Sequence, residues 1–269
     1  MANKRFKLLR CRRSGIEAVE ADTTLVFGRH THEQFGVGMI ERGAQKSASG
    51  RGVVEAGAGD IITVNPGEVH DGAPIGDGGR AWRMLYIDPA IIVEWASDID
   101  EERTSVSLEF NLPAISDQRM ASLFRKLFHA MTCSDAEPNG LKADEALWLL
   151  LGGLLLTRTD DRRLVPAGIA SARALIDDDP AAVLTLATLA REAKLSRYQF
   201  LRSFARATGL TPHAYVMQRR IHRARQLIGS GVQLAEAAAN SGFSDQSHMT
   251  RLFTRSFGMA PGTYAKAMG

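Results

Sequence analysis

Hydrophobic positions up to about residue 90 fall in short runs bounded by Gly, Asn, Asp or Pro. Examples are "TTLVFG", "FGVGMI", "GVVEAG", "GDIITVNPG" and "RAWRMLYID". Short runs between turn residues are typical of β-strands. Several strands at this spacing predict a sandwich or a small barrel. The sequence therefore predicts a β-rich unit at its amino-terminal end.

Longer amphipathic patterns follow this unit. Over 117–131 apolar residues recur every three or four positions, which predicts a helix with one apolar face. A second helix is predicted over 141–156 and contains the longest apolar run, "LWLLLGGLLL". That run is about half a membrane span, so we expect a buried or dimer-interface helix. The polar, Pro-containing stretch 157–168 is predicted to be a linker.

The rest of the chain has helical patterns separated by Gly, Ser, Thr and Pro. These residues are the usual punctuation of short helices. We expect helices at about 168–177, 185–193, 196–207, 211–229, 233–240, 245–257 and 261–267. Seven short helices without strands between them predict an all-α domain.

One pattern occurs twice in this helical part. "RSFARATGLTPHAY" (202–215) and "RLFTRSFGMAPGTY" (251–264) share six residue types at the same intervals, 49 positions apart. In each copy a short helix, a tight turn and a second helix predict a helix-turn-helix unit. Ser196 and Ser244 are the expected N-caps. The offset is 48 up to the cap and 49 afterwards, so we expect one extra residue at the start of the second copy's second helix.

The second helix of each unit is predicted to expose polar and basic side chains. Arg can pair with guanine and Gln with adenine, apolar groups can meet the thymine methyl, and Arg also reaches phosphates. The candidate DNA-contacting residues are Arg197, Tyr198, Leu201, Arg202 and Arg206 in the first copy and Gln246, Ser247, Thr250, Arg251 and Arg255 in the second.

The helix predicted between the two units fits such a role. Over 211–229 it would be about 28 Å long. Two recognition helices held that far apart could enter major grooves about 34 Å apart on one face of the duplex. Its run "QRRIHRAR" contains Arg219 and Arg220. These two residues either add positive charge towards DNA or form an ordinary polar helix surface.

Charge supports the same division of the chain. Residues 1–161 carry 18 Lys and Arg against 24 Asp and Glu, a net charge of −6. Residues 162–269 carry 15 against 6, a net charge of +9. A basic module joined to an acidic one suggests nucleic-acid binding by the basic half. Cys11 and Cys133 fit no zinc or disulfide pattern and are expected to be free thiols in a reducing cytoplasm.

The last hundred residues resemble the DNA-binding domain of the AraC/XylS family of transcription regulators. The resemblance rests on "LSRYQFLRSFARATGLTPHAYVMQRRIHRARQLI" and "AAANSGFSDQSHMTRLFTRSFGMAPGTY". It implies base-reading positions at Tyr198, Leu201 and Arg202, and at Gln246, Ser247 and Arg251. Arg202 and Arg251 are also candidates for salt bridges within the fold.

The resemblance also implies an α+β two-domain architecture. Residues 1–160 would form a cupin-like β-barrel with dimerisation helices, and 161–269 an all-α domain with two helix-turn-helix units. A cytoplasmic homodimer would bind double-stranded DNA and a small-molecule effector, without a cofactor, an enzymatic activity or a membrane. The effector's identity and the choice between activation and repression stay open.

Three histidines raise the question of a metal. The stretch "GRHTHEQFGVGMIERGAQ…GDIITVNPGEVHDG" resembles a cupin barrel, in which imidazoles and a carboxylate can hold a metal ion. His30 and His32, two apart on a presumed strand, would share a face and could meet His70. Glu33 would point to the opposite face, so a carboxylate ligand is missing. The sequence therefore favours a metal-free pocket lined by these histidines.

Further effector-binding candidates come from the sugar-binding member of the family. Resemblance to it places Arg42, His70 and Met84 at or near positions that face the effector. Trp82 would share a strand face with Met84 and supply an apolar wall.

The alternative to a transcription regulator is a cupin-type metalloenzyme with an accessory helical tail. That function would leave the repeated helix-turn-helix pattern and the basic half of the chain unexplained.

Overall fold

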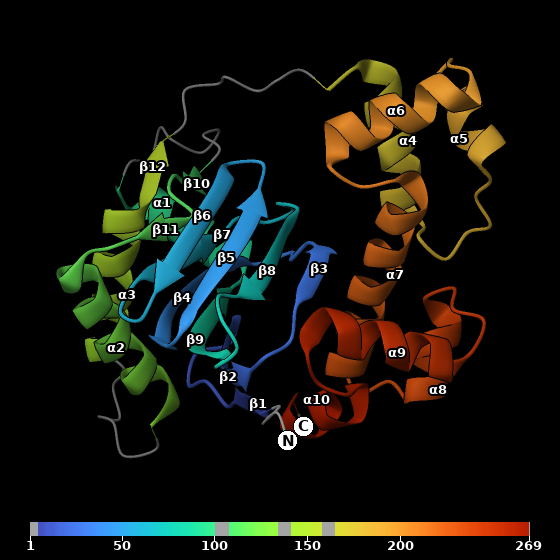
Figure 1. Cartoon of the computed structure of the whole chain (residues 1–269). Coiled ribbons are helices and arrows are strands. Elements are labelled where there is room, and N and C mark those ends of the chain that lie inside the picture. Colours follow the sequence, from blue (N-terminus) through green and yellow to red (C-terminus); the bar gives the residue numbers. More distant parts are fainter. Residues whose placement is uncertain (1–4, 100–107, 134–140, 158–164, 269) are drawn as a thin grey trace. The chain divides into compact units, whose positions relative to one another are not determined.

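The computed structural model describes residues 5–99, 108–133, 141–157 and 165–268. It divides into two compact units, Met1–Asp161 and Arg162–Gly269 (Figure 1). Within the described part of the chain, no helix is long and apolar enough to cross a membrane.

The amino-terminal unit is built on two antiparallel sheets. The larger has the strand order β1-β2-β9-β4-β7-β11, the smaller β3-β8-β5-β6, and β10 pairs with β12. The strands are β1 (Arg5–Leu9), β2 (Ile16–Thr23), β3 (Phe27–His30), β4 (Phe35–Arg42), β5 (Ala44–Ser49), β6 (Gly52–Gly57), β7 (Ile61–Val64), β8 (His70–Pro74), β9 (Arg80–Ile87), β10 (Leu108–Phe110), β11 (Ala114–Ile115) and β12 (Leu155–Thr157). The predicted β-rich unit is confirmed.

Strand β9 separates two apolar cores. Leu85 and Ile87 are fully buried in the core that the larger sheet shares with the helices. Met84 belongs to a second, smaller core, and Trp82 and Tyr86 pack against it. Because side chains alternate along a strand, these three residues share one face, as predicted for Trp82 and Met84.

Three helices cover the larger sheet: α1 (Pro89–Ile99), α2 (Gln118–Thr132) and α3 (Leu141–Leu154). The apolar face of α2 is buried in the large core, and Asp117 caps the helix by accepting from the backbone N–H groups of its first turn. The two predicted helices are present. The sequence missed α1, and the predicted end of α3 is wrong because Leu155–Thr157 pairs with β10 instead.

Seven helices form the described part of the second unit, as predicted. They are α4 (Ala167–Asp178), α5 (Leu186–Glu192), α6 (Arg197–Thr208), α7 (Pro212–Gly229), α8 (Leu234–Asn240), α9 (Gln246–Phe257) and α10 (Pro261–Met268). Helix α7 contacts both helix pairs, α5–α6 through α6 and α8–α9 through both members. Most of the predicted linker 157–168 lies outside the described residues, and its end belongs to α4.

Candidate functional site

Helices α5 and α6 form the first helix-turn-helix unit. Ser196 accepts a hydrogen bond from the N–H of Gln199, whose side chain accepts one from the N–H of Ser196. This reciprocal capping box satisfies two donors at the start of α6. Gly209 ends the helix in the left-handed region, with φ 75°. Phe200 and Phe204, four apart, are fully buried. The predicted cap at Ser196 is confirmed.

Helices α8 and α9 form the second unit, with one correction to the expected cap. Asp245, not Ser244, is the N-cap of α9, and it accepts from the N–H of His248 at 2.7 Å. That hydrogen bond and one from the Ser244 hydroxyl lower the pKa of the Asp245 carboxyl. A carboxylate also suits the positive end of the helix dipole, which adds to the stability of this cap.

The extra residue of the second copy lies in the turn and not in the helix, because α6 and α9 begin and end 49 positions apart. In the first turn Lys194 has φ 55°, and the N–H of Leu195 bonds to the carbonyl of Ala190. In the second, Gly242 has φ 80°, and Phe243 repeats the bond with Ala238. The turns therefore match at an offset of 48, and Ser244 is the inserted residue.

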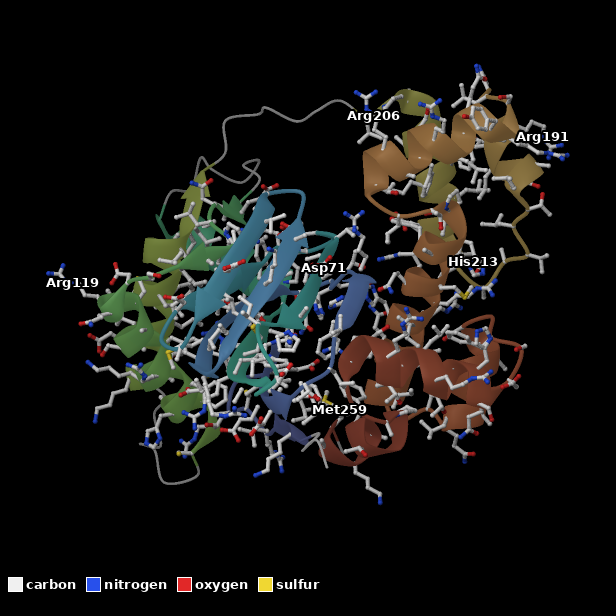
Figure 2. All side chains as sticks on the ribbon, in the orientation of Figure 1. Asp71, Arg119, Arg191, Arg206, His213 and Met259 are labelled. Carbon is white, nitrogen blue, oxygen red and sulfur yellow. The ribbon has the colours of Figure 1, made fainter. Side chains whose placement is uncertain are left out.

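The ten candidate DNA-contacting residues occupy equivalent places in the two helices. Nine are exposed and Thr250 is half-buried. Arg206 projects outward near the end of α6 (Figure 2). At an offset of 49 they form five pairs: Arg197 with Gln246, Tyr198 with Ser247, Leu201 with Thr250, Arg202 with Arg251, and Arg206 with Arg255.

Arg202 and Arg251 form no ion pair with any residue in the described part of the chain. The guanidinium of Arg202 lies 5.7 Å from the ring centroid of Tyr198 and 3.4 Å from its hydroxyl. This cation–π contact orients both side chains on one face of α6. The salt-bridge alternative from the sequence is therefore not realised for this pair of arginines.

The basic run of α7 is largely engaged within the unit. Arg220 donates to the carbonyls of Pro180, Ala182 and Gly242 and so fastens the second turn to the segment after α4. Arg219 lies 3.0 Å from a carboxylate oxygen of Asp177. Arg220 is thus a structural residue, and the polar-surface alternative describes this run better than a surface that adds free charge.

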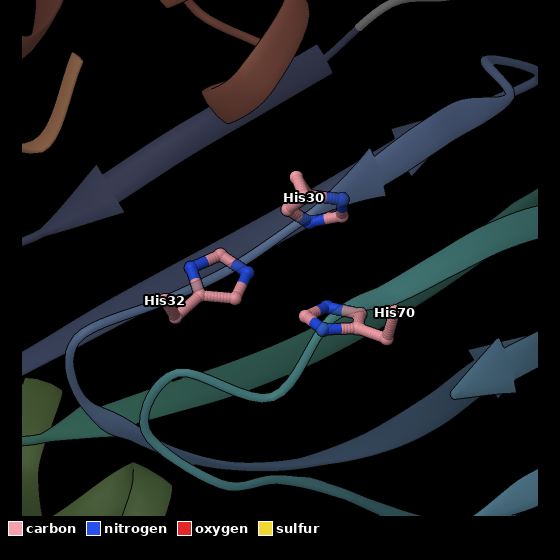
Figure 3. A group of neighbouring side chains, drawn as sticks. All are labelled: His30, His32 and His70. Atoms are coloured by element: carbon pink, nitrogen blue, oxygen red, sulfur yellow. The ribbon is translucent and has the colours of Figure 1, made fainter. Parts of the chain in front are cut away.

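In the amino-terminal unit, His30, His32 and His70 come together (Figure 3). One nitrogen from each ring lies within 4.8 Å of the other two. His30 ends β3 and pairs with His70 at the start of β8, whereas His32 lies beyond the strand in the following loop. The sequence predicted that the three histidines converge, but the explanation by strand alternation was wrong. The path of the loop after β3 brings the His32 side chain to the other two.

Backbone carbonyls fix two of these rings. Nδ1 of His30 is 2.8 Å from the carbonyl oxygen of Gly28, and Nδ1 of His70 is 3.0 Å from that of Glu68. A carbonyl only accepts, so both Nδ1 atoms carry the proton. In a neutral ring the lone pair is then on Nε2. Burial lowers the pKa of His70, which favours this neutral form.

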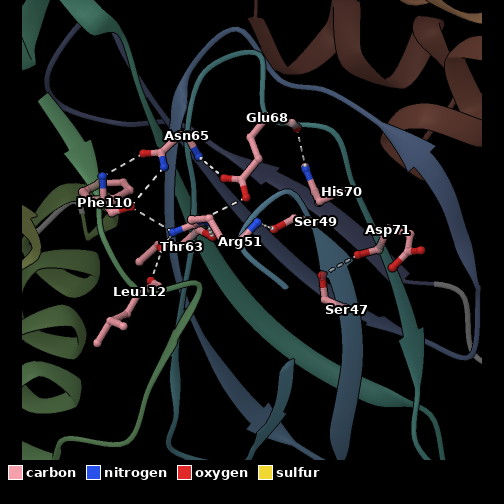
Figure 4. Close-up of polar contacts among 10 residues, drawn as sticks. All are labelled: Ser47, Ser49, Arg51, Thr63, Asn65, Glu68, His70, Asp71, Phe110 and Leu112. Carbon is pink, nitrogen blue, oxygen red and sulfur yellow. Dashed lines mark hydrogen bonds and ion pairs between the residues drawn. The ribbon is translucent and has the colours of Figure 1, made fainter. Parts of the chain in front are cut away.

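The loop that presents His70 is anchored by a polar network (Figure 4). Arg51 pairs with the Glu68 carboxylate at 2.8 Å and donates to the carbonyls of Thr63 and Phe110. The Asn65 side chain donates to the carbonyl of Phe110 and accepts a hydrogen bond from the N–H of the same residue. Burial alone would raise the pKa of Glu68, but the hydrogen bonds from Arg51 and Ser49 lower it below its usual range.

The remaining effector candidates are not all near the histidines. Met84 is buried over Gly36 and Gly38, whose missing Cβ atoms leave the space it fills. Arg42 is exposed and pairs with Asp22 at 2.6 Å. Trp82 is packed among the side chains of Phe6, Phe27 and Arg80.

Two residues on the same strand face were missed by the sequence reasoning. The Tyr86 ring lies 4.8 Å from that of His32. Arg80 is fully buried, donates to the carbonyls of Leu25 and Gly72, and has its pKa lowered to about 10 by burial. Extending the alternation of Trp82 and Met84 by two positions each way would have found both.

Comparison with known proteins agrees with this geometry. The family model of the AraC-like ligand binding domain matches residues 13–151. The chain belongs to the AraC family of transcription regulators. A model of a helix-turn-helix domain matches residues 189–267 of this AraC-family protein, from within α5 to α10. The match therefore includes α6 and α9, the second helices of both helix-turn-helix units.

Full-length relatives support the assignment. The HTH-type transcriptional regulator YbfI of Bacillus subtilis is 29% identical over 236 residues, 83% of this chain and 81% of YbfI. The HTH-type transcriptional activator RhaR of Enterobacter sp. is 24% identical over 254 residues, 88% of this chain and 86% of RhaR. A crystal structure of an apo ToxT variant from Vibrio cholerae matches with a TM-score of 0.61 at 13% identity, covering 97% of this chain and 100% of ToxT, which shows the shared fold.

Proposed function

We propose that this regulator recognises its operator by inserting α6 and α9 into successive major grooves. The observation that carries the proposal is the equivalence of the two helices. They have the same length, a buried pair at equivalent positions, caps at equivalent positions, and five outward-facing residue pairs 49 positions apart. A helix of this size fits the major groove, and its exposed Arg and Gln side chains can read base edges there.

The acidic unit is proposed to regulate this binding, not to catalyse a reaction. Its β-rich interior would receive the effector, with His30, His32, His70, Met84 and Trp82 as lining candidates and Arg42 near the rim. The ligand must favour one arrangement of the protein over another, because only differential affinity shifts an equilibrium. The active form is proposed to be a cytoplasmic homodimer, which would present four helix-turn-helix units to the operator.

Binding of the full-length protein to DNA fragments from the region of its own gene tests the core of this proposal. We expect one fragment to bind far more tightly than random DNA of the same length, with an affinity that falls as salt rises. Equal, weak binding to every fragment would contradict sequence-specific recognition.

The paired arginines test which contacts specify sequence. Arg202→Ala and Arg251→Ala should each weaken operator binding by about 1–3 kcal/mol and relax one base position, each in a different half of the site. Arg191→Ala, on the exposed surface of α5, is the matched control. Equal losses on operator and random DNA would identify phosphate contacts instead.

A further inference from the structure

The three-histidine group has the chemistry of a metal site. Imidazole is the ligand that Zn²⁺, Cu²⁺ and Ni²⁺ take readily, whereas Mg²⁺ and Ca²⁺ require oxygen. Zinc–nitrogen bonds of about 2.0–2.1 Å in a tetrahedral site place two ligand nitrogens about 3.3 Å apart. The three nitrogens lie within 4.8 Å of one another, so small torsions of the rings would bring them to that spacing.

The orientation of the rings is a second, independent observation. Metal-ligating histidines almost always donate their other N–H to a carbonyl or a carboxylate, which fixes the tautomer. His30 and His70 do so through Nδ1 to the carbonyls of Gly28 and Glu68. Their Nε2 atoms therefore hold the lone pairs that a metal ion needs.

The scaffold holds these ligands in place. His30 and His70 sit opposite each other on paired strands, so the ladder of β3 and β8 sets their separation. Arg51 and Asn65 fasten the loop before His70 through Glu68 and Phe110. A metal ion would not have to order this segment first, and preorganisation of this kind raises affinity.

We infer that His30, His32 and His70 bind one divalent transition-metal ion through their imidazole nitrogens. The sequence favoured a metal-free pocket because a carboxylate ligand was missing. Three protein ligands suffice when water or an exchangeable ligand occupies the fourth position, as it does in catalytic zinc sites. Binding here does not depend on DNA recognition, so the inference and the proposed function can fail separately.

Metal binding by untagged, full-length protein tests the inference. After dialysis against EDTA and then buffer, isothermal titration with ZnCl₂ should give one site per chain, and MgCl₂ should give none. His32→Gln should weaken zinc binding by about a hundredfold or more, since loss of even a supporting contact costs 10–100-fold. The control, His213→Ala, removes an exposed histidine of the helical unit and should leave binding unchanged.

A spectroscopic readout makes the result independent of variant folding. Co²⁺ added to the wild-type protein should give visible d–d bands of a low-coordinate, nitrogen-ligated ion, and Zn²⁺ should abolish them. Absence of a stoichiometric site in the wild-type protein would overturn the inference. So would a site that His32→Gln and His70→Gln leave intact while their thermal unfolding shows a folded barrel, because the ion would then lie elsewhere.

Discussion

Arg220 shows at the scale of one residue how a basic side chain can be structural. Its guanidinium bonds three carbonyls on two segments, including that of Gly242 in the second turn. Arg220→Ala should lower the free energy of unfolding by about 1–2 kcal/mol, because those carbonyls lose their donors. Arg220→Lys keeps the charge but lacks the planar fork, so it should not restore stability. Urea denaturation measures both.

A neighbouring arginine supplies the control for that experiment. Arg223 makes one exposed ion pair with Asp179, at 3.0 Å. Such pairs contribute about 0–1 kcal/mol, so Arg223→Ala should change stability little. If Arg220→Lys were as stable as the wild type while Arg220→Ala was not, charge and not the bond geometry would be what matters.

Cys11 should be an unreactive thiol. Burial, with a smaller contribution from Glu17, raises its pKa to about 11. At pH 8 about one in a thousand of these groups is then thiolate, against about a quarter for an ordinary thiol. In Cys133→Ser protein, iodoacetamide should therefore modify Cys11 roughly 250-fold more slowly than free cysteine at pH 8. The rate should rise about tenfold for each pH unit above 8. Mass spectrometry follows the reaction, and a rate equal to that of free cysteine would contradict it.

At the scale of the element, the two turns of the helix-turn-helix units are an internal comparison. Lys194 adopts φ 55°, where a side chain is strained, and Gly242 occupies the equivalent place. Lys194→Gly should raise the free energy of unfolding by about 0.5–1 kcal/mol. A loss of stability would mean that the lysine side chain makes a contribution larger than its backbone strain.

Gly242 should tolerate no side chain. Its Cβ would lie 2.7 Å from the Cα of Ala181 and 3.0 Å from Nε of Arg220, in addition to the cost of its positive φ. Gly242→Ala should therefore cost about 2–4 kcal/mol. Gly231 has φ 88°, and an alanine Cβ there would have no atom within 4 Å, so Gly231→Ala isolates the backbone cost, about 1 kcal/mol. Equal thermal shifts for both variants would show that crowding at Gly242 is relieved.

These elements also show what the sequence could predict. Helices α6 and α9 follow from the Phe and Gly spacing, because burial of an i,i+4 pair and a left-handed C-cap leave a local signature. The cap at Asp245 was missed, since Ser244 and Asp245 are both good caps and only the turn length decides between them. His32 was predicted to join its partners for the wrong reason, because a loop path set by long-range pairing has no local pattern.

At the scale of the whole molecule, the proposed dimer needs a contact surface, and the exposed residues of α2 and α3 show where it could lie. The apolar face of α2 is already buried against the protein's own sheet. On α3, Leu147, Leu150 and Leu151 are likewise buried, whereas Leu149 is 54% exposed. An exposed leucine on a helix whose other leucines are buried in the core is a candidate for an interface between subunits.

Leu149→Glu should therefore convert a dimer to a monomer without unfolding the protein. A carboxylate buried in an apolar subunit interface without a partner charge loses its hydration, and this cost disfavours association. Sedimentation equilibrium should show half the mass of the wild type, and operator affinity should fall as one half of the avidity is lost. Leu112→Glu, at a residue 53% exposed outside α3, is the matched control and should stay dimeric. A dimeric Leu149→Glu variant would place the subunit contacts away from this face. A monomeric wild-type protein would leave the two recognition helices of one chain to carry operator binding.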